Sequence, residues 1–201
     1  MKRRLQVSAS PRVARWRLGC DRGAQIVEFA LSLPLLVVFV VGIFDFTGAL
    51  SLKQKLTNAA REAARVAAAD PANDLGNAVP VSVSDAFQVV DNYLKSENIN
   101  DCGLSGNMTP TSSGMVWTSA ALTGCPGGTG LTLTVDRGSV DRGCITTQTI
   151  NGTPTDIVNT CVTILYPYTW RFSSVIKVML PTASYAKVIN IRSTATAFNE
   201  N

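Results

Sequence analysis

The stretch RGAQIVEFALSLPLLVVFVVGIFDFTGALSLKQKLTNAAREAARVAAA, residues 22–69, decides the architecture of this chain. One acid, Glu28, stands near its start, and no further charge occurs from Phe29 until Asp45. A hydrocarbon core about 30 Å thick needs roughly 20 helical residues to cross it. The sequence therefore predicts a membrane-spanning helix over residues 29–48, with a carboxylate where the helix enters the membrane and Asp45 close to the far interface.

Beyond the span the predicted helix becomes amphipathic. Its small and apolar residues recur at helical spacing, at Leu56, Ala59, Ala60, Ala63 and Ala67. Such a stripe is expected to pack either on the rest of its own chain or on another helix. Asp70-Pro71 should end the helix, because the residue before a proline avoids helical geometry. We therefore expect one continuous helix over residues 24–69.

Basic residues gather ahead of this helix. Residues 1–23 hold seven Lys or Arg against one acid, a net charge of +6, while the remainder holds eleven basic and thirteen acidic residues, a net charge of −2. Positive charge beside one end of a span favours the cytoplasmic side. We expect a cytoplasmic leader over residues 1–23, a helix over 24–70 and an extracytoplasmic domain over 71–201. Nucleic-acid binding is the competing interpretation of the leader, and we expect no nucleic-acid partner.

The cysteines agree with export. Cys20 lies in the leader, and an even set follows in the outward domain, at Cys102, Cys125, Cys144 and Cys161. Disulfides form and persist in extracytoplasmic compartments. A four-thiolate zinc site is the competing interpretation, but the gaps lack the close Cys-x-x-Cys pairs of such sites.

The outward domain begins with a loop over residues 71–83 and a helix that Ser84 should cap, running to about residue 98. Short β-type segments follow, at residues 115–119, 131–135, 144–150, 155–166 and 187–198. Two Asp-Arg-Gly triplets, at Asp136 and Asp141, should form turns between strands. The expected fold is α+β, with the second helix packed on a small antiparallel sheet.

One hairpin also bears on the disulfides. Asn151-Gly152 is a strong hairpin signal, and a register that sets Ile150 opposite Thr155 sets Cys144 opposite Cys161. That register allows a cross-strand disulfide and leaves Cys102 and Cys125 to close a loop. The two other pairings of the four cysteines stay formally open.

A family resemblance rests on several motifs in the first third of the chain. These motifs are Arg22-Gly23-Ala24, Val27-Glu28-Phe29-Ala30, Leu33-Pro34, Phe44-Asp45-Phe46 and Asn58-Ala59-Ala60-Arg61-Glu62-Ala63-Ala64-Arg65. Together they resemble the TadE-like family of minor pilins, or pseudopilins, of the tight-adherence (Tad, Flp) pilus system. A weaker similarity lies in residues 166–168 and 192–196.

The resemblance implies a processing site. A prepilin peptidase would cut between Gly23 and Ala24, so that Glu28 becomes the fifth residue of the mature protein. The new amino group on Ala24 would lie one helical turn from the Glu28 carboxylate, which compensates the amine of its own or a neighbouring subunit. Glu28 and Phe29 would then form the processing and assembly motif.

The resemblance also implies contacts and partners. Asp45, Arg61 and Arg65 are candidates for contacts between subunits. The expected partners are the membrane, prepilin peptidase, the inner-membrane Tad assembly platform, the major Flp pilin and other minor pilins. The fold would be pilin-like, on a protein that crosses the inner membrane once with its N-terminus in the cytoplasm.

Two classes of function remain after the residue inventory. The chain has no histidine, which removes Ser-His and Cys-His pairs and most zinc-hydrolase ligand sets. Residues 126–130 are glycine-rich, but no lysine-bearing helix follows, so they do not form a phosphate loop. We expect no catalysis, no metal and no cofactor. The leading hypothesis is a processed minor pilin that acts in pilus assembly and adhesion, and the alternative is an unprocessed single-span envelope protein whose outward domain binds a surface or a partner.

Overall fold

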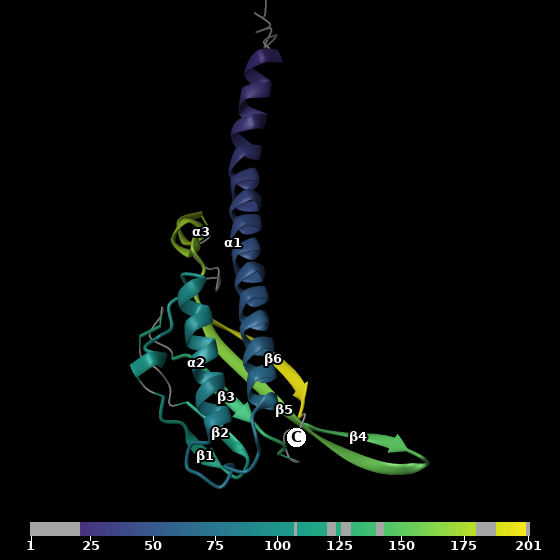
Figure 1. Ribbon diagram of the computed structural model, residues 1–201. Helices are drawn as coiled ribbons and strands as arrows, with labels where there is room; N and C mark the ends of the chain where they lie inside the picture. Colours follow the sequence, from purple (N-terminus) through teal and green to yellow (C-terminus); the bar gives the residue numbers. More distant parts are fainter. Residues whose placement is uncertain are drawn as a thin grey trace, which may run out of the picture. The chain divides into compact units, whose positions relative to one another are not determined.

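The structure is a computed structural model that describes residues 21–106, 108–119, 124–125, 130–139, 143–179 and 188–199. The expected leader up to residue 20, with Cys20, lies outside the described residues, as do Asp141, residues 126–129 and residue 187. The chain divides into two compact units between Val40 and Val41, inside the first helix. The second unit carries the rest of that helix, the other helices and the sheet (Figure 1).

Helix α1 runs from Asp21 to Ala69. Its end agrees with the stop predicted at Asp70-Pro71. Asp21 is also the first described residue, and the helix includes residues 21–23, ahead of the expected Ala24. A glycine in a helix costs only about 1 kcal/mol relative to alanine, so Gly23 is compatible with this. Gly23 and Ala24 therefore both lie within the first turns of α1.

Helix α2, Val81–Ser96, begins earlier than predicted. Ser84 is not its N-cap, because the Ser84 backbone N–H already donates to the Pro80 carbonyl at 3.0 Å, as expected inside a first turn. Pro80 is the cap residue, with extended backbone and no capping side chain of its own. The Asp74 carboxylate supplies a remote cap instead, since it accepts a hydrogen bond from the Val81 N–H at 2.6 Å.

The described residues form a six-stranded antiparallel sheet in the order β1-β2-β3-β5-β4, with β6 paired to β5. Its strands are β1 Thr111–Ser113, β2 Val116–Thr118, β3 Thr132–Asp136, β4 Ile145–Ile150, β5 Thr153–Tyr168 and β6 Ile189–Phe198. The short elements β1, η1 (Leu104–Gly106) and α3 (Ser173–Met179) were not predicted. The α+β class with a long N-terminal apolar helix, a second helix and an antiparallel sheet is confirmed.

The hairpin of β4 and β5 has a different register from the predicted one. Ile150 pairs with Thr153, not with Thr155, because Asn151 and Gly152 alone form the turn. Both have positive φ, 51° and 81°, the conformation that a two-residue hairpin turn requires. The hairpin extends beyond the rest of the sheet (Figure 1), and β4 and the first residues of β5 are largely exposed.

The core of the second unit lies between one face of the sheet and the two long helices. α1 contributes its small residues, α2 contributes Phe87, Val90 and Leu94, and the sheet contributes Leu133 and Ile164. The whole predicted stripe of α1 is buried, at Leu56, Ala59, Ala60, Ala63 and Ala67. Of the two partners considered for it, the stripe packs on its own domain.

Candidate functional site

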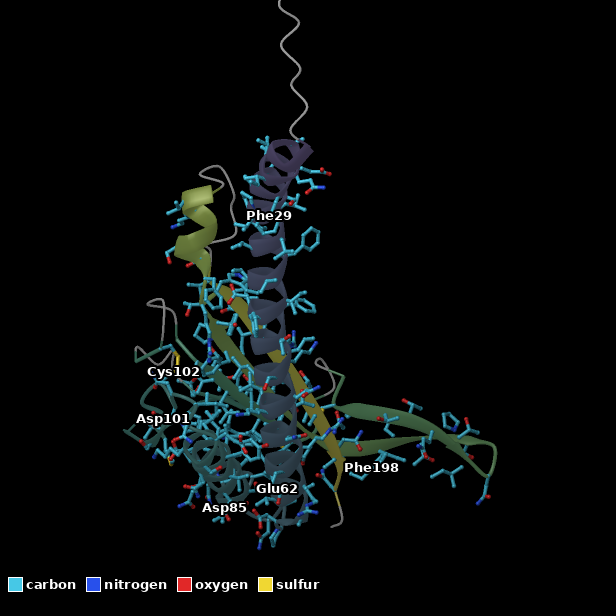
Figure 2. The ribbon with its side chains drawn as sticks, turned by 90° about the horizontal axis from the view of Figure 1, so that it is seen from above. Phe29, Glu62, Asp85, Asp101, Cys102 and Phe198 are labelled. Atoms are coloured by element: carbon cyan, nitrogen blue, oxygen red, sulfur yellow. A yellow bond between two sulfur atoms is a disulfide. The ribbon has the colours of Figure 1, made fainter. Side chains whose placement is uncertain are left out.

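The predicted processing segment lies in an exposed part of α1. Gly23, Ala24 and Glu28 are all exposed, and Phe29 is 64% exposed, projecting from the helix (Figure 2). A Cβ atom added at Gly23 would meet no atom within 4 Å among the described residues. Packing inside this chain therefore does not require glycine at position 23, and its role in peptidase recognition stays a prediction.

Asp45 is a fully buried carboxylate at the end of the apolar run. It accepts hydrogen bonds from the backbone N–H groups of Arg171, at 3.0 Å, and Phe172, at 3.3 Å, in the turn between β5 and α3. Backbone N–H groups stabilise a buried carboxylate because they bond its charged form. The Asp45 carboxylate therefore contacts its own chain, and a role between subunits stays a prediction.

Tyr168, the last residue of β5, makes a second contact at the same level of α1. Its hydroxyl donates to the Asp45 carbonyl at 3.3 Å, and its ring packs edge-on against Trp170 with centroids 5.4 Å apart. Burial, and then the negative charge of Asp45, raise the pKa of the Tyr168 hydroxyl, which keeps it protonated as a donor. A Cβ at Gly48 would lie 3.1 Å from that hydroxyl oxygen, so the small residue permits the approach.

Asp45→Ala is expected to loosen the turn after β5. It leaves the buried N–H groups of Arg171 and Phe172 without their carboxylate, and losing a charged acceptor costs about 1.5–3 kcal/mol. Hydrogen-exchange mass spectrometry of the full chain in detergent should show faster exchange over residues 169–179 and unchanged exchange over residues 56–67. Asp45→Asn is the matched control, since it keeps one acceptor oxygen and should change less. Equal protection in the alanine variant would show that this contact does not hold the turn.

The two arginines predicted to contact other subunits are exposed on α1. Arg65 pairs with Glu62 at 3.0 Å, an exposed ion pair of the kind that contributes about 1 kcal/mol or less. Arg61 borders a shallow groove of about 240 Å³ that also includes Leu50, Lys53 and Thr57. Both side chains are accessible to a partner, and their role between subunits stays a prediction.

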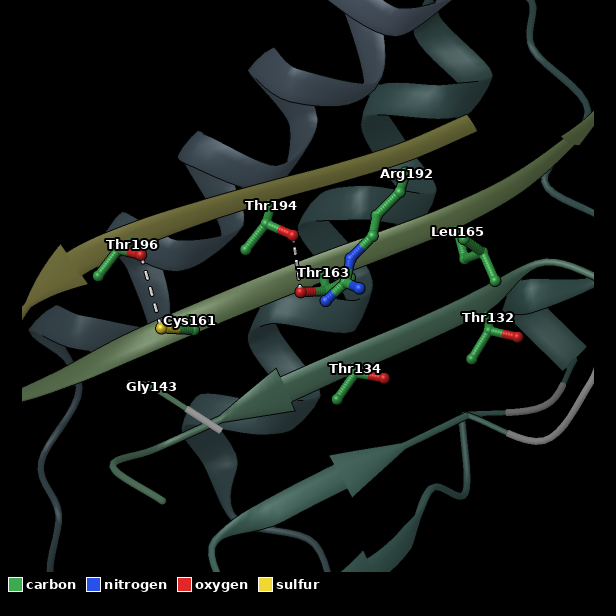
Figure 3. A pocket seen from close by; sticks show the side chains of 9 residues that line it. All are labelled: Thr132, Thr134, Gly143, Cys161, Thr163, Leu165, Arg192, Thr194 and Thr196. Carbon is green, nitrogen blue, oxygen red and sulfur yellow. Dashed lines mark hydrogen bonds between the residues drawn. The ribbon is translucent and has the colours of Figure 1, made fainter. Parts of the chain in front are cut away.

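The sheet carries a threonine-rich face on the side opposite the helices. Its central strands line a hollow of about 310 Å³ (Figure 3) with Thr132, Thr134, Thr163, Thr194 and Thr196. The hydroxyls of Thr163 and Thr194 lie 3.0 Å apart across β5 and β6. The other residues that line the hollow are Gly143, Cys161, Leu165 and Arg192. The alternation of threonines along these strands is the sequence signal for this face.

The structure joins Cys102 to Cys125 and Cys144 to Cys161 as disulfides, with Cα atoms 4.6 and 5.8 Å apart. Cys144 stands opposite Asn159, whose N–H donates to the Cys144 carbonyl at 3.0 Å. Its disulfide to Cys161 therefore runs diagonally, two residues away from the directly opposed pair that we expected. The bond closes the base of the projecting hairpin.

Mass spectrometry of the unreduced, exported protein is expected to show Cys102 linked to Cys125 and Cys144 linked to Cys161. Each link should contribute about 2–4 kcal/mol by restricting the unfolded chain. Replacing Cys144 and Cys161 together by serine should also speed hydrogen exchange over residues 145–158, because an isolated two-stranded hairpin is marginally stable. Free thiols at all four positions would contradict both the pairing and the export.

Arg137 is a buried cation that ties three elements together. Its guanidinium donates to Thr160 Oγ1 and to the Asp70 carbonyl, both at 3.1 Å, and so joins the end of β3 to β5 and to the end of α1. Burial lowers the pKa of Arg137, and the negative charges of Asp70 and Asp74 act in the opposite direction and raise it. The turn predicted at this triplet is present, because Asp136 Oδ1 accepts hydrogen bonds from the N–H groups of residues 138 and 139.

Asp70→Asn is expected to stabilise the domain modestly at pH 7. Burial, and then the charge of Asp85, raise the pKa of Asp70 above its unfolded value, against the opposing effect of Arg137. A carboxyl with a raised folded pKa stabilises fully below the unfolded pKa and loses that contribution as the pH rises through the folded pKa. The melting temperature of the variant in detergent should exceed that of the wild type by about 1–3 °C at pH 7. The difference should vanish below pH 4, and a difference independent of pH would contradict this explanation.

Among the described residues no group of three or more His, Cys, Asp or Glu side chains is placed to hold a metal ion. α1 is the one helix there with the length and composition to cross a membrane, and none of its apolar window is buried. These features define a protein with one exposed apolar N-terminal helix joined to an α+β domain. Residues 23–65 match the family model of TadE-like proteins. The resemblance to the TadE-like family is confirmed over that segment. No curated protein and no solved structure matches the chain.

Proposed function

We propose that this protein is a minor pilin, or pseudopilin, of a Tad/Flp-type pilus, processed by prepilin peptidase between Gly23 and Ala24. It acts in pilus assembly and thereby in surface adhesion. It crosses the inner membrane once, with residues 1–23 in the cytoplasm and the α+β domain outside. Its partners are the peptidase, the Tad assembly platform, the major Flp pilin and other minor pilins. It is not an enzyme and uses no cofactor.

One observation carries the proposal: the TadE-like segment, residues 23–65, includes the apolar run of α1, and the large apolar side chains of that run are exposed. Leu31 is 76% exposed, and Leu35, Phe39 and Phe44 are each 64–66% exposed. Contiguous apolar surface of this extent marks contact with a membrane or with other proteins. In a bilayer lipid covers this surface, and in a filament the same surface can pack on the helices of other pilins.

Glu28 adds a second argument. A carboxylate within an apolar helix is expensive to transfer into lipid, by about 2.5–3.5 kcal/mol at the bilayer centre and less towards its edge. A positive partner removes that penalty. Cleavage after Gly23 creates an amine on Ala24 about one helical turn away, so processing itself would supply the partner.

The alternative is an unprocessed membrane anchor, and the start of α1 is the observation that favours it. The helix already includes residues 21–23, so the Gly23–Ala24 bond lies within helical structure, where a peptidase reaches it only after local unwinding. The first turn of a helix has free N–H groups and unwinds readily. The two candidate functions predict different N-termini: a processed pilin has lost the leader, and an unprocessed anchor keeps it.

N-terminal sequencing of the protein purified from membranes of its native host tests the proposal. A pilin begins at Ala24, and an anchor keeps Met1. The same chain expressed in a host without a prepilin peptidase is the matched control and should begin at Met1. Met1 in the native host, in cells that produce Tad pili, would overturn the proposed processing.

A further inference from the structure

We propose that residues 170–179, the turn after β5 together with α3, form a membrane-surface element that lies in the interfacial layer of the bilayer that α1 crosses. The inference goes beyond the proposed function. It rests only on α1 being a membrane span, and neither processing nor pilus assembly enters it.

The Asp45 contact places this element. Its two hydrogen bonds hold Arg171 and Phe172 against α1, and α3 begins at the next residue, Ser173. On α1 itself, the apolar neighbours Ile43 and Phe44 are 64% and 65% exposed. The start of α3 is therefore fixed at the level where the apolar run of α1 ends. A bilayer that covers Ile43 and Phe44 brings its surface to this element.

The side chains of the element suit that layer. Val178 is 84% exposed, so its side chain is accessible to lipid. Arg171 and Lys177 are exposed beside it. Trp170 lies half-buried at the start of the segment, edge-on to Tyr168. Tryptophan concentrates at membrane interfaces, and basic residues on a short amphipathic segment are attracted to anionic lipid headgroups.

The direction of α3 agrees with this placement. Figures 1 and 2 both show α3 beyond the ends of α2 and β5, away from the short strands β1 and β2. The opposite end of the domain contains Val81, the first residue of α2, which is 62% exposed. That end lies near the C-terminal end of α1. Asp74 follows α1 closely in the chain, and its carboxylate accepts a hydrogen bond from the Val81 N–H. Val81 is thus an exposed valine that the proposal places far from the bilayer.

A bilayer is favoured over a second protein by continuity with the span. A span over the predicted residues 29–48 places lipid headgroups near its second end, and the Asp45 contact holds the turn at that level. A protein partner would need a separate complementary surface, and a lipid surface is present without one.

The experiment uses the full chain with Cys20→Ser, reconstituted in nanodiscs of phosphatidylethanolamine and phosphatidylglycerol. An environment-sensitive fluorophore is attached to a single introduced cysteine in each of three variants: Val178→Cys, Val81→Cys and Leu36→Cys. A lipid that carries a nitroxide at its headgroup quenches a fluorophore at the membrane surface. A lipid that carries it in the acyl chain quenches one inside the membrane.

The fluorophore at position 178 is expected to be quenched by the headgroup nitroxide several-fold more strongly than the one at position 81. The fluorophore at position 36 should respond to the acyl-chain nitroxide. Equal, weak quenching at 178 and 81, with strong quenching at 36, would overturn the proposal while α1 stays a span. A blue-shifted but unquenched fluorophore at 178 would indicate a covering protein copy and would overturn it as well. Absence of quenching at position 36 would show that α1 does not cross the bilayer. That result would overturn both this inference and the membrane part of the proposed function.

Discussion

Gly23→Val is expected to abolish removal of the leader. The protein in native-host membranes should then be about 2.7 kDa heavier than the processed form, which is the summed mass of residues 1–23. The physical reason is access: a peptidase must approach the backbone at the cleaved bond, and a β-branched side chain there blocks that approach and stiffens the local chain. Gel mobility together with N-terminal sequencing measures the outcome.

The substitution of Gly23 should not disturb the fold. A Cβ at Gly23 meets nothing within 4 Å, so valine at this position disturbs no packing among the described residues. Gly42, on the same helix, is equally open. Gly42→Val is therefore the matched control and should be processed normally. Unchanged mobility of the Gly23→Val protein in the native host would contradict cleavage at this bond.

The features that were predicted correctly are those that a sequence encodes locally. The end of α1 follows from Asp70-Pro71, and its buried stripe follows from helical spacing that runs over several turns. The place of the hairpin follows from Asn151-Gly152. In each case the determining residues are neighbours in the chain, so periodicity and turn chemistry suffice.

The features that were missed depend on contacts between distant residues. The contact of Asp45 with its own chain was not predicted, because its hydrogen-bond partners lie 126 and 127 residues further on. Ser84 has the side chain of a cap, but Asp74 and the loop before α2 set where that helix begins. β1 has three exposed residues and α3 has seven residues, so neither carries enough apolar periodicity to be predicted. The predicted hairpin register is wrong for a local reason: Asn151 and Gly152 form the turn alone, so Thr153 and Pro154 belong to β5 and not to the turn.

Glu28→Gln is expected to separate processing from assembly. Peptidase recognition should depend mainly on Gly23, the basic leader and the apolar helix, none of which this substitution changes. Glutamine keeps nearly the shape of glutamate and removes its charge. The variant should therefore still be cut after Gly23, and sequencing of the membrane form should still give Ala24.

Assembly should fail in the same variant. In the packed helices of a filament, water is excluded, and an amine without a counter-charge is strongly destabilising. The Ala24 amine of the Glu28→Gln protein has lost that counter-charge, so the mature protein should collect in the inner membrane and pili should become few or absent by electron microscopy. Glu62→Gln is the matched control, because Glu62 is an exposed carboxylate on the same helix whose pairing with Arg65 lies on the surface; its pili should be normal. Normal piliation by a cleaved Glu28→Gln protein would show that the carboxylate does not direct assembly and serves only where the helix enters the membrane.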